Sequence, residues 1–209
     1  ELARMAHHDS LTGLPNRRLL ADRLQQSLAR ARRNRTCLAL LVMDLDGFKP
    51  INDAHGHEGG DRALRTIARR FADALRQNDT LARVGGDEFA LLATDPGSAD
   101  EAARAAQAIA AKCVAIASQP LAIEAVDTRV GVSIGIAVRD GCGNVDELLN
   151  AADQAMYEAK QAGGGRYVLA GGVAESADAA LDCARFQRSA HFDSGANAAT
   201  RSTPSGVSA

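Results

Sequence analysis

Apolar positions along the chain recur with two spacings, one typical of helices and one typical of buried strands. Leu20, Leu24 and Leu28 follow each other at intervals of four residues, which predicts an amphipathic helix through about Arg33. The run Leu38–Met43 is apolar at every position, as in a strand that is buried on both faces. Helical spacing of apolar residues predicts further helices over 64–75, 99–118 and 145–162.

Two hairpins are predicted between these helices. In the first, strands over Thr80–Val84 and Asp87–Thr94 flank the pair Gly85-Gly86. Two adjacent glycines favour a primed two-residue turn, because such a turn requires positive φ angles. The remaining expected elements are a second hairpin over 121–126 and 128–138, a short strand near 166–169, and a polar, glycine-rich loop over 47–60.

Both ends of the chain differ from its middle. Residues 1–8 are interpreted as the end of a helix that enters from an upstream region, since the chain begins with Glu rather than Met. After residue 169, Ala, Gly, Ser and Thr dominate, and so few large apolar residues cannot offset the entropy of ordering. We therefore expect one domain over 9–169 and a mostly disordered tail over 170–209, with a short helix near 177–187.

Charge and composition narrow the class of protein. The chain of 209 residues has 24 Lys and Arg against 26 Asp and Glu, which argues against a dedicated duplex-DNA or polybasic membrane binder. No run approaches the ~18 apolar residues of a membrane span, and no signal peptide is present. Cys37 and Cys113 fall in apolar stretches, which is typical of buried reduced thiols. We expect a cytoplasmic domain, with a membrane anchor still possible in the full-length protein.

The main chemical signal is a pair of acidic clusters at strand ends. Asp44 and Asp46 end one apolar strand, and Asp87 and Glu88 open another directly after two glycines. Hard divalent cations such as Mg²⁺ prefer carboxylate oxygens, and metals held in this way suit phosphoryl or nucleotidyl transfer. The alternative interpretation is structural, because acidic residues are common at strand ends and turns.

Three other patterns are weaker. Gly131-Val-Ser133-Ile-Gly135 matches the GxSxG motif of serine hydrolases, but that motif requires a sharp turn after the serine. Here the apolar residues continue, so Ser133 is expected in the middle of a strand. His55 and His57 have no further Cys or His nearby to complete a zinc site, and no Walker-type phosphate loop is present. From residue chemistry alone, Arg76, Asp79 and Lys160 are ordinary helix-end or turn residues.

Five stretches taken together resemble a known family. They include Arg83-Val-Gly-Gly-Asp-Glu-Phe89, which contains the signature for which the GGDEF family, the diguanylate cyclases, is named. The resemblance covers about residues 6–169. The other stretches, in the order of the family, are Asp9–Arg17, Asp44–Asp53 with Gly56–Asp61, Ser133–Ala137 and Ala152–Lys160.

The resemblance implies an α+β fold similar to the palm of nucleotide cyclases and polymerases, with a mostly antiparallel central sheet surrounded by helices. It implies a bacterial signalling enzyme that condenses two GTP molecules into cyclic di-GMP and releases two pyrophosphates. Each domain would hold one GTP, so catalysis would need a homodimer. A sensory region upstream would regulate the domain, and nucleic acid is not expected as a partner.

The resemblance also assigns roles to individual residues. Asp44 and Asp87 would bind Mg²⁺ or Mn²⁺, helped by the carbonyl of Leu45. Asp87 or Glu88 would help to deprotonate the attacking hydroxyl, and Lys49 would stabilise phosphate charge. The substrate-binding positions that match the family are Asn52 and Asp61 for guanine, His57 and Gly86 near the nucleoside, and Lys160 and Arg166 for phosphate.

The family also has an inhibitory site for its product, and Arg76 and Asp79 match it. The second arginine of that site corresponds to Ala108, with Arg104 one turn earlier. A further departure is Gly164, which stands where the family usually has a basic residue; Arg166 follows two residues later. These departures motivate an alternative function, a non-catalytic signalling module that binds GTP or cyclic di-GMP.

Overall fold

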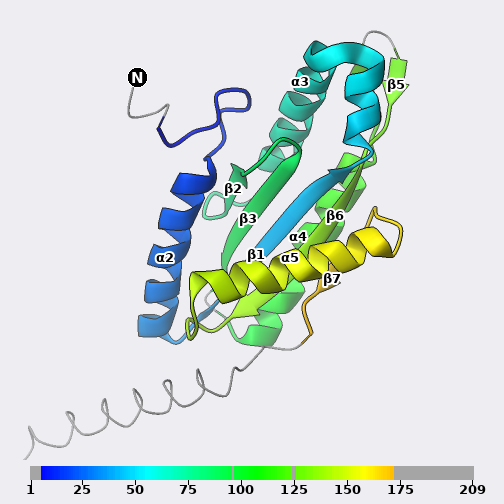
Figure 1. Cartoon of the computed structure of the whole chain (residues 1–209). Helices are drawn as coiled ribbons and strands as arrows, with labels where there is room; N and C mark the ends of the chain where they lie inside the picture. Colours follow the sequence, from blue (N-terminus) through cyan, green and yellow to red (C-terminus); the bar gives the residue numbers. More distant parts are fainter. Residues whose placement is uncertain (1–5, 96, 124–125, 172–209) are drawn as a thin grey trace, which may run out of the picture. The chain divides into compact units, whose positions relative to one another are not determined.

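The computed structural model describes residues 6–95, 97–123 and 126–171. In this part of the chain, four helices accompany a five-stranded sheet and a separate two-stranded ribbon (Figure 1). The helices are α2 (Arg17–Asn34), α3 (Phe48–Ala74), α4 (Ala99–Ala117) and α5 (Val145–Gln161). The strands are β1 (Cys37–Asp46), β2 (Thr80–Arg83), β3 (Glu88–Asp95), β4 (Leu121–Ile123), β5 (Val126–Thr128), β6 (Gly131–Arg139) and β7 (Tyr167–Leu169).

The five-stranded sheet has the order β2-β3-β1-β6-β7, with β1 at its centre. β1 pairs antiparallel with both β3 and β6, and β2 pairs antiparallel with β3. Only the short strand β7 runs parallel to its neighbour β6. The observed fold is thus α+β with a mixed, mostly antiparallel sheet, which confirms the predicted fold class.

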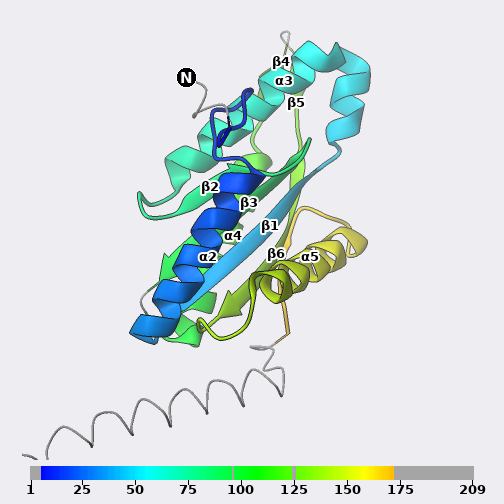
Figure 2. The same ribbon diagram turned by 60° about the vertical axis from the view of Figure 1, so that its left-hand side comes forward.

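Helices cover both faces of this sheet (Figures 1 and 2). Successive side chains of a strand point to opposite faces, so Leu41 and Met43 of β1 pack with α3 and α4, whereas Leu38 and Leu40 pack with α2 and α5. All four side chains are almost fully buried. The prediction of a strand buried on both faces is therefore confirmed.

The predicted limits of α4 and α5 agree with the structure to within one residue. Both helices begin at a side chain that accepts a backbone hydrogen bond of the first turn, Ser98 from Glu101 N and Asn144 from Glu147 N. Such caps satisfy amide groups that have no partner inside the helix. Because a cap and its partner are three residues apart, these limits are encoded locally.

The prediction of a glycine-rich loop over 47–60 is wrong, because most of this segment is helical. α3 begins at Phe48 and bends at Gly56, whose φ of 65° and ψ of 177° are not helical. We call the helical segments before and after Gly56 the first and second arms of α3. Phe48 and Ile51 are buried, and Gly59 and Gly60 are buried as well. The glycines of this segment therefore serve close packing and a bend rather than a loop.

Both hairpin predictions need correction. Neither Gly85 nor Gly86 has a positive φ, so the expected primed two-residue turn is absent and residues 84–87 connect β2 to β3. A Cβ on Gly85 would lie 2.5 Å from Glu88 Oε2, so the glycine makes room for that side chain. The second predicted hairpin, over 121–126 and 128–138, is also different in the structure. There β4 pairs with β5, whereas β6 pairs with β1 and β7 in the main sheet.

Parts of the predicted chain ends lie outside the described residues, namely 1–5 of the expected entering helix and 172–209 of the expected tail. Residues 6–8 form a turn, and His8 makes a bridge to Pro15. Cys37 and Cys113 are buried, as predicted. None of the helices in the described ranges combines the length and the apolar character that a membrane span requires.

Candidate functional site

The two acidic clusters meet at one end of the sheet. Asp44, near the end of β1, lies opposite Glu88 of β3 and Ser133 of β6 in the strand register. The backbone amide of Leu45 donates to the carbonyl of Asp87 at 3.2 Å. The register therefore brings together the Asp44-Leu45 strand end and the loop that carries Asp87, although the two lie about forty residues apart in the sequence.

Lys160 belongs to the same cluster. It lies in the last turn of α5, and its Nζ is 2.8 Å from Asp44 Oδ2. Burial raises the pKa of the Asp44 carboxyl above its ordinary value; Lys160 opposes this rise, and the nearby carboxylates of Asp87 and Asp46 add to it. The Asp44 side chain is only 14% exposed, so its negative charge needs a cation close by.

The donor set of this cluster fits a hard divalent cation. Among the described residues, no three His, Cys, Asp or Glu side chains are grouped as a metal site. A site here would combine the carboxylates of Asp44 and Asp87 with the backbone carbonyl of Leu45, which are all oxygen donors of the kind that Mg²⁺ and Mn²⁺ prefer. The ammonium group on Asp44 already shows that this position accepts a positive charge.

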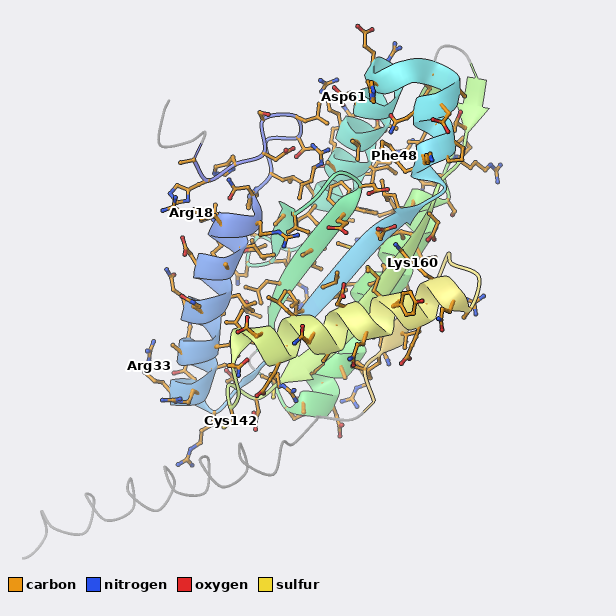
Figure 3. All side chains as sticks on the ribbon, viewed as in Figure 1. Arg18, Arg33, Phe48, Asp61, Cys142 and Lys160 are labelled. Atoms are coloured by element: carbon orange, nitrogen blue, oxygen red, sulfur yellow. The ribbon has the colours of Figure 1, made fainter. Side chains whose placement is uncertain are left out.

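The two arms of α3 bring Asn52 against Gly60, the residue before Asp61. A Cβ on Gly60 would overlap the side chain of Asn52, so Asn52 lies directly beside the residue that precedes Asp61. Phe48 and Asp61 mark the first and second arms in Figure 3, and Asp61 Oδ2 is 3.8 Å from Arg65 Nη2. The bend at Gly56 thus brings the Asn52 amide beside the backbone that leads into Asp61, and an amide with a carboxylate could meet both donors and acceptors of a base.

Lys49 and His57 are exposed on the first arm and at the start of the second arm of α3. Neither side chain makes a hydrogen bond or ion pair within the described part of the chain. Glu88 is partly exposed, and its Oε2 is 3.8 Å from Arg17 Nη2. Space is open around Gly86, where an added Cβ would have no neighbour within 4 Å. These groups are accessible to a ligand.

The loop after α5 contains Gly163, Gly164 and Gly165, whose φ angles are 102°, 70° and 59°. Three consecutive left-handed residues favour glycine strongly. The first two amides bond to carbonyls at the end of α5, and the amide of Gly165 donates to Asp46 Oδ2 at 2.8 Å. All three amides therefore have partners within the chain. The cationic side chains that flank this loop in the sequence are Lys160 and the exposed Arg166, whose Nε donates to Gly164 O at 3.2 Å.

Ser133 is fully buried within β6, which agrees with the exclusion of a serine hydrolase. Its Oγ donates to Asp46 Oδ1 at 2.7 Å. From the sequence, Asp46 was placed in the acidic cluster but was given no role of its own, although it lies two residues from Asp44 and therefore on the same face of β1. Only the structure shows that Asp46 holds two other segments of the chain.

A second group that sequence reasoning missed surrounds Arg83. Its guanidinium donates to Asp9 and to the carbonyl of Gly86, at distances between 2.7 and 3.1 Å. The Asp9 carboxylate also accepts from the amide and hydroxyl of Thr12. Arg83 thereby joins the turn at residues 9–16 to the loop that carries Asp87. In the sequence, the one indication that Asp9 and Arg83 matter was that both lie in motifs of the family.

Arg76 and Asp79 lie in the turn between α3 and β2. The backbone amide of Arg76 donates to Asp79 Oδ2 at 3.1 Å, and the amide of Asp79 donates to the carbonyl of Arg76 at the same distance. Among the described residues, the guanidinium of Arg76 has no hydrogen-bond or ion-pair partner. The turn therefore presents an exposed arginine beside a carboxylate that is held in place.

Comparisons with known proteins agree with this arrangement. Residues 6–166 match the family described as diguanylate cyclase, GGDEF domain. The bifunctional diguanylate cyclase/cyclic di-GMP phosphodiesterase MucR of Pseudomonas aeruginosa is 47% identical over 168 residues, which cover 80% of this chain and 24% of MucR. The chain thus spans about a quarter of the length of this curated relative.

Two solved structures are similar over most of the chain. The GGDEF domain of TpbB from Pseudomonas aeruginosa has a TM-score of 0.73 at 38% identity, and the match covers 87% of this chain and 99% of that one. The coiled coil and GGDEF domain of DgcB from Caulobacter crescentus, solved in complex with cyclic di-GMP, has a TM-score of 0.71 at 30% identity and covers 81% and 88%. The chain therefore belongs to the GGDEF family of diguanylate cyclase domains.

Proposed function

We propose that this chain condenses two GTP molecules into cyclic di-GMP and releases two pyrophosphates. The observation that carries the proposal is the cluster of Asp44, Asp87 and Lys160, in which a largely buried carboxylate and a second acid lie beside a cation at one end of the sheet. Family membership and the diguanylate cyclase activity named for MucR support it.

The chemistry needs no protein nucleophile. The 3′-oxygen of one GTP forms a bond to the α-phosphorus of the other, the bond from that phosphorus to the oxygen bridging to the β-phosphorus breaks, and pyrophosphate leaves. The same displacement in the reverse direction, from the 3′-oxygen of the second nucleotide to the α-phosphorus of the first, closes the ring and releases the second pyrophosphate. Asp87 or Glu88 would accept the proton of the attacking hydroxyl. Mg²⁺ or Mn²⁺ on Asp44, Asp87 and the Leu45 carbonyl would supply charge neutralisation for the phosphates.

Binding and orientation would come from residues around the cluster. Asn52 and Asp61 are proposed to recognise guanine, because an amide and a carboxylate match its mixed acceptors and donors. His57 would contact the nucleoside, and the space at Gly86 would admit the nucleotide against the backbone. The cations that would face the phosphates are Lys49, Lys160 and Arg166.

Each chain offers one such site, so two chains would have to meet with their substrates facing each other. The reaction is thereby expected to depend on a homodimer, with the charge and position of the reacting groups as the main sources of rate enhancement. An upstream sensory region would regulate how often the two sites meet.

The test is pyrophosphate release from GTP with Mg²⁺ over a range of protein concentrations, with the product identified by mass spectrometry. Turnover per protein should rise with concentration, because two half-sites must associate. Asp87→Ala should abolish turnover. Asp153→Ala is a matched control, since Asp153 is exposed on α5 and makes no interaction with the described residues. Equal activity of Asp87→Ala and the unaltered protein would refute the assignment.

Product inhibition is proposed at Arg76 and Asp79. The exposed guanidinium of Arg76 can present two parallel donors to guanine or phosphate, and Asp79 is already held beside it. Cyclic di-GMP should bind in calorimetry, and Arg76→Ala should weaken that binding by about tenfold or more, since hydrogen bonds to charged groups contribute about 1.5–3 kcal/mol. Unchanged affinity in Arg76→Ala would exclude this site.

The second candidate is a non-catalytic module that binds GTP or cyclic di-GMP. The glycine at position 164, where the family usually has a basic residue, favours this candidate. Binding of either nucleotide without pyrophosphate release at any protein concentration would support it over the cyclase.

A further inference from the structure

Asp46 connects three segments that are distant in the sequence. Its Oδ1 accepts a hydrogen bond from Ser133 Oγ at 2.7 Å, and its Oδ2 accepts one from the amide of Gly165 at 2.8 Å. Asp46 ends β1, Ser133 lies in β6, and Gly165 follows α5. A single carboxylate thus joins the strand of the acidic cluster to the glycine loop at 163–165.

Glycines make the close approach to this carboxylate possible. A Cβ on Gly164 would lie 2.8 Å from Asp46 Oδ2, and a Cβ on Gly131 would lie at the same distance from that oxygen. The absence of a side chain at position 164 therefore has a structural role: the backbone of the loop lies directly against Asp46. Its left-handed φ of 70° also favours glycine.

The loop lies between the two cations proposed for phosphate. Lys160 is in the last turn of α5, just before the loop, and its Nζ contacts Asp44. Arg166 follows the loop, its Nε bonds to Gly164 O, and its carbonyl accepts from Ile134 N of β6 at 2.9 Å. The position of the loop therefore affects both cations.

We propose that Asp46, with Ser133, is a positioning residue that holds the loop 163–165 and thereby directs Lys160 and Arg166 toward the triphosphate of GTP. This inference rests on the proposed function, because it concerns how that substrate is bound. Asp46 would act through the loop, because each of its oxygens accepts a hydrogen bond from another segment of the chain, and the Mg²⁺ measurement described below distinguishes this role from that of a metal ligand.

We call the hydrogen bonds of Asp46 to Ser133 and Gly165 the anchor. The first experiment measures the anchor directly and does not require catalysis. In Asp46→Ala both acceptor oxygens are lost, so the amide of Gly165 loses its partner, whereas in Asp46→Asn the amide oxygen can still accept from Gly165 while its NH2 group donates to Ser133 Oγ. The amide proton of Gly165, measured by NMR hydrogen exchange, should therefore exchange at least tenfold faster in Asp46→Ala and change less in Asp46→Asn. Exchange at the unaltered rate in Asp46→Ala would overturn the anchoring, whether or not the protein is a cyclase.

The second experiment tests the effect on substrate. GTP binding is measured by calorimetry, and KM, kcat and the Mg²⁺ concentration for half-maximal rate are measured wherever turnover occurs. Asp46→Ala and Ser133→Ala should weaken GTP binding and raise KM about tenfold with a smaller change in kcat, and the Mg²⁺ requirement should stay the same. A raised Mg²⁺ requirement at unchanged KM would instead make Asp46 a metal ligand and refute the proposal.

A pair of glycine variants separates the contact with Asp46 from backbone strain. Gly164→Ala and Gly165→Ala both introduce a side chain at a left-handed residue, but only the added Cβ at position 164 would meet the Asp46 carboxylate, whereas an added Cβ at position 165 would have no neighbour within 4 Å. Gly164→Ala should weaken GTP binding several-fold more than Gly165→Ala. Equal losses of GTP affinity would mean that backbone strain alone causes them and would overturn this part of the inference.

The outcomes for the anchor and for the proposed function can be distinguished. If cyclic di-GMP never forms while the binding results are as expected, the proposed function is wrong and the role of Asp46 in holding the loop is retained.

Discussion

Arg83 Nη1 donates hydrogen bonds to both carboxylate oxygens of Asp9, at 3.0 and 3.1 Å. Both side chains are largely buried, at 13% and 21% exposed. The other donors of the same guanidinium, Nε and Nη2, bond to the carbonyl of Gly86. The turn at residues 9–16 and the loop of the acidic cluster are thus held by one arginine.

The first prediction concerns the contribution of Asp9 to stability. Asp9→Asn should lower the free energy of unfolding at pH 7 by about 1–3 kcal/mol, because a charge-assisted pair loses its ionised acceptor while the arginine stays largely buried. Chemical denaturation measures this difference. Asp22→Asn is the control, since Asp22 is exposed on α2 without an interaction among the described residues, and it should change stability little.

The same pair predicts a pH dependence. Burial alone would raise the pKa of Asp9, but the hydrogen bonds from Thr12 and the contacts with Arg83 outweigh it and lower the pKa below its ordinary value. A carboxyl with a depressed pKa stabilises the folded state above its unfolded pKa of about 3.9, and this contribution disappears as the pH falls through the folded pKa. The stability difference between the unaltered protein and Asp9→Asn should be constant from about pH 5 to 8 and shrink below about pH 4. A difference that grows in acid would contradict the assignment.

The third prediction concerns the contact between Gly60 and Asn52. A Cβ on Gly60 would overlap the Asn52 side chain and approach Phe48 to 3.2 Å. Gly60→Ala should therefore displace Asn52 and weaken GTP binding, whereas in an Asn52→Ala background the same change should have a clearly smaller effect. Calorimetry on the four proteins of this double-mutant cycle gives the coupling. Additive effects would show that Gly60 does not act through Asn52.

The fourth prediction concerns the packing of α5 on the sheet. A Cβ on Gly135 of β6 would overlap backbone atoms of Ala152 and Met156, so α5 would have to move away. Gly135→Ala should destabilise the fold by about 1–3 kcal/mol or more, as overpacking in a core does. Gly171→Ala serves as the control, because an added Cβ there has no neighbour within 4 Å. Equal midpoints of chemical unfolding for the two variants would refute the close approach.

The fifth prediction concerns the reactivity of Cys113. Burial raises the pKa of its thiol to about 11, and Lys112 opposes this only partly. Thiolate is the reactive species, so Cys113 should resist alkylation at pH 8 in the folded protein and react readily in denaturant. Mass spectrometry of the modified peptide measures both rates. Rapid labelling of the folded protein would place Cys113 outside the core.

Several features could be predicted from the sequence because they depend on nearby residues. The helix at Arg17–Asn34 follows from leucines at intervals of four, and α4 and α5 begin at caps that lie within three residues of their partners. β1 was recognisable because a continuous apolar run satisfies both faces of a sheet. The GGDEF signature identified the family. The acidic residues at the strand ends indicated which end of the sheet carries the candidate site.

The segment at 47–60 was mispredicted because its glycines are required by tertiary packing. Gly60 has no side chain because Asn52 and Phe48 lie against it, and no local pattern distinguishes such a glycine from one in a loop. The prediction of a primed turn at Gly85-Gly86 was wrong for a similar reason. Gly85 is a glycine because the Glu88 side chain lies against it, and its φ angle is not positive.

The contacts that organise the site are decided by the tertiary structure. Asp46 and Gly165 are 119 residues apart, and Asp9 and Arg83 are 74 apart. Periodicity and caps report interactions over three or four residues, whereas the partner of a carboxylate at a strand end depends on sheet register and on how each helix packs. The sequence by itself therefore determined the family, most of the elements and the acidic residues, but the roles of Asp46 and Arg83 became visible only once β1, β6 and the loops were packed together.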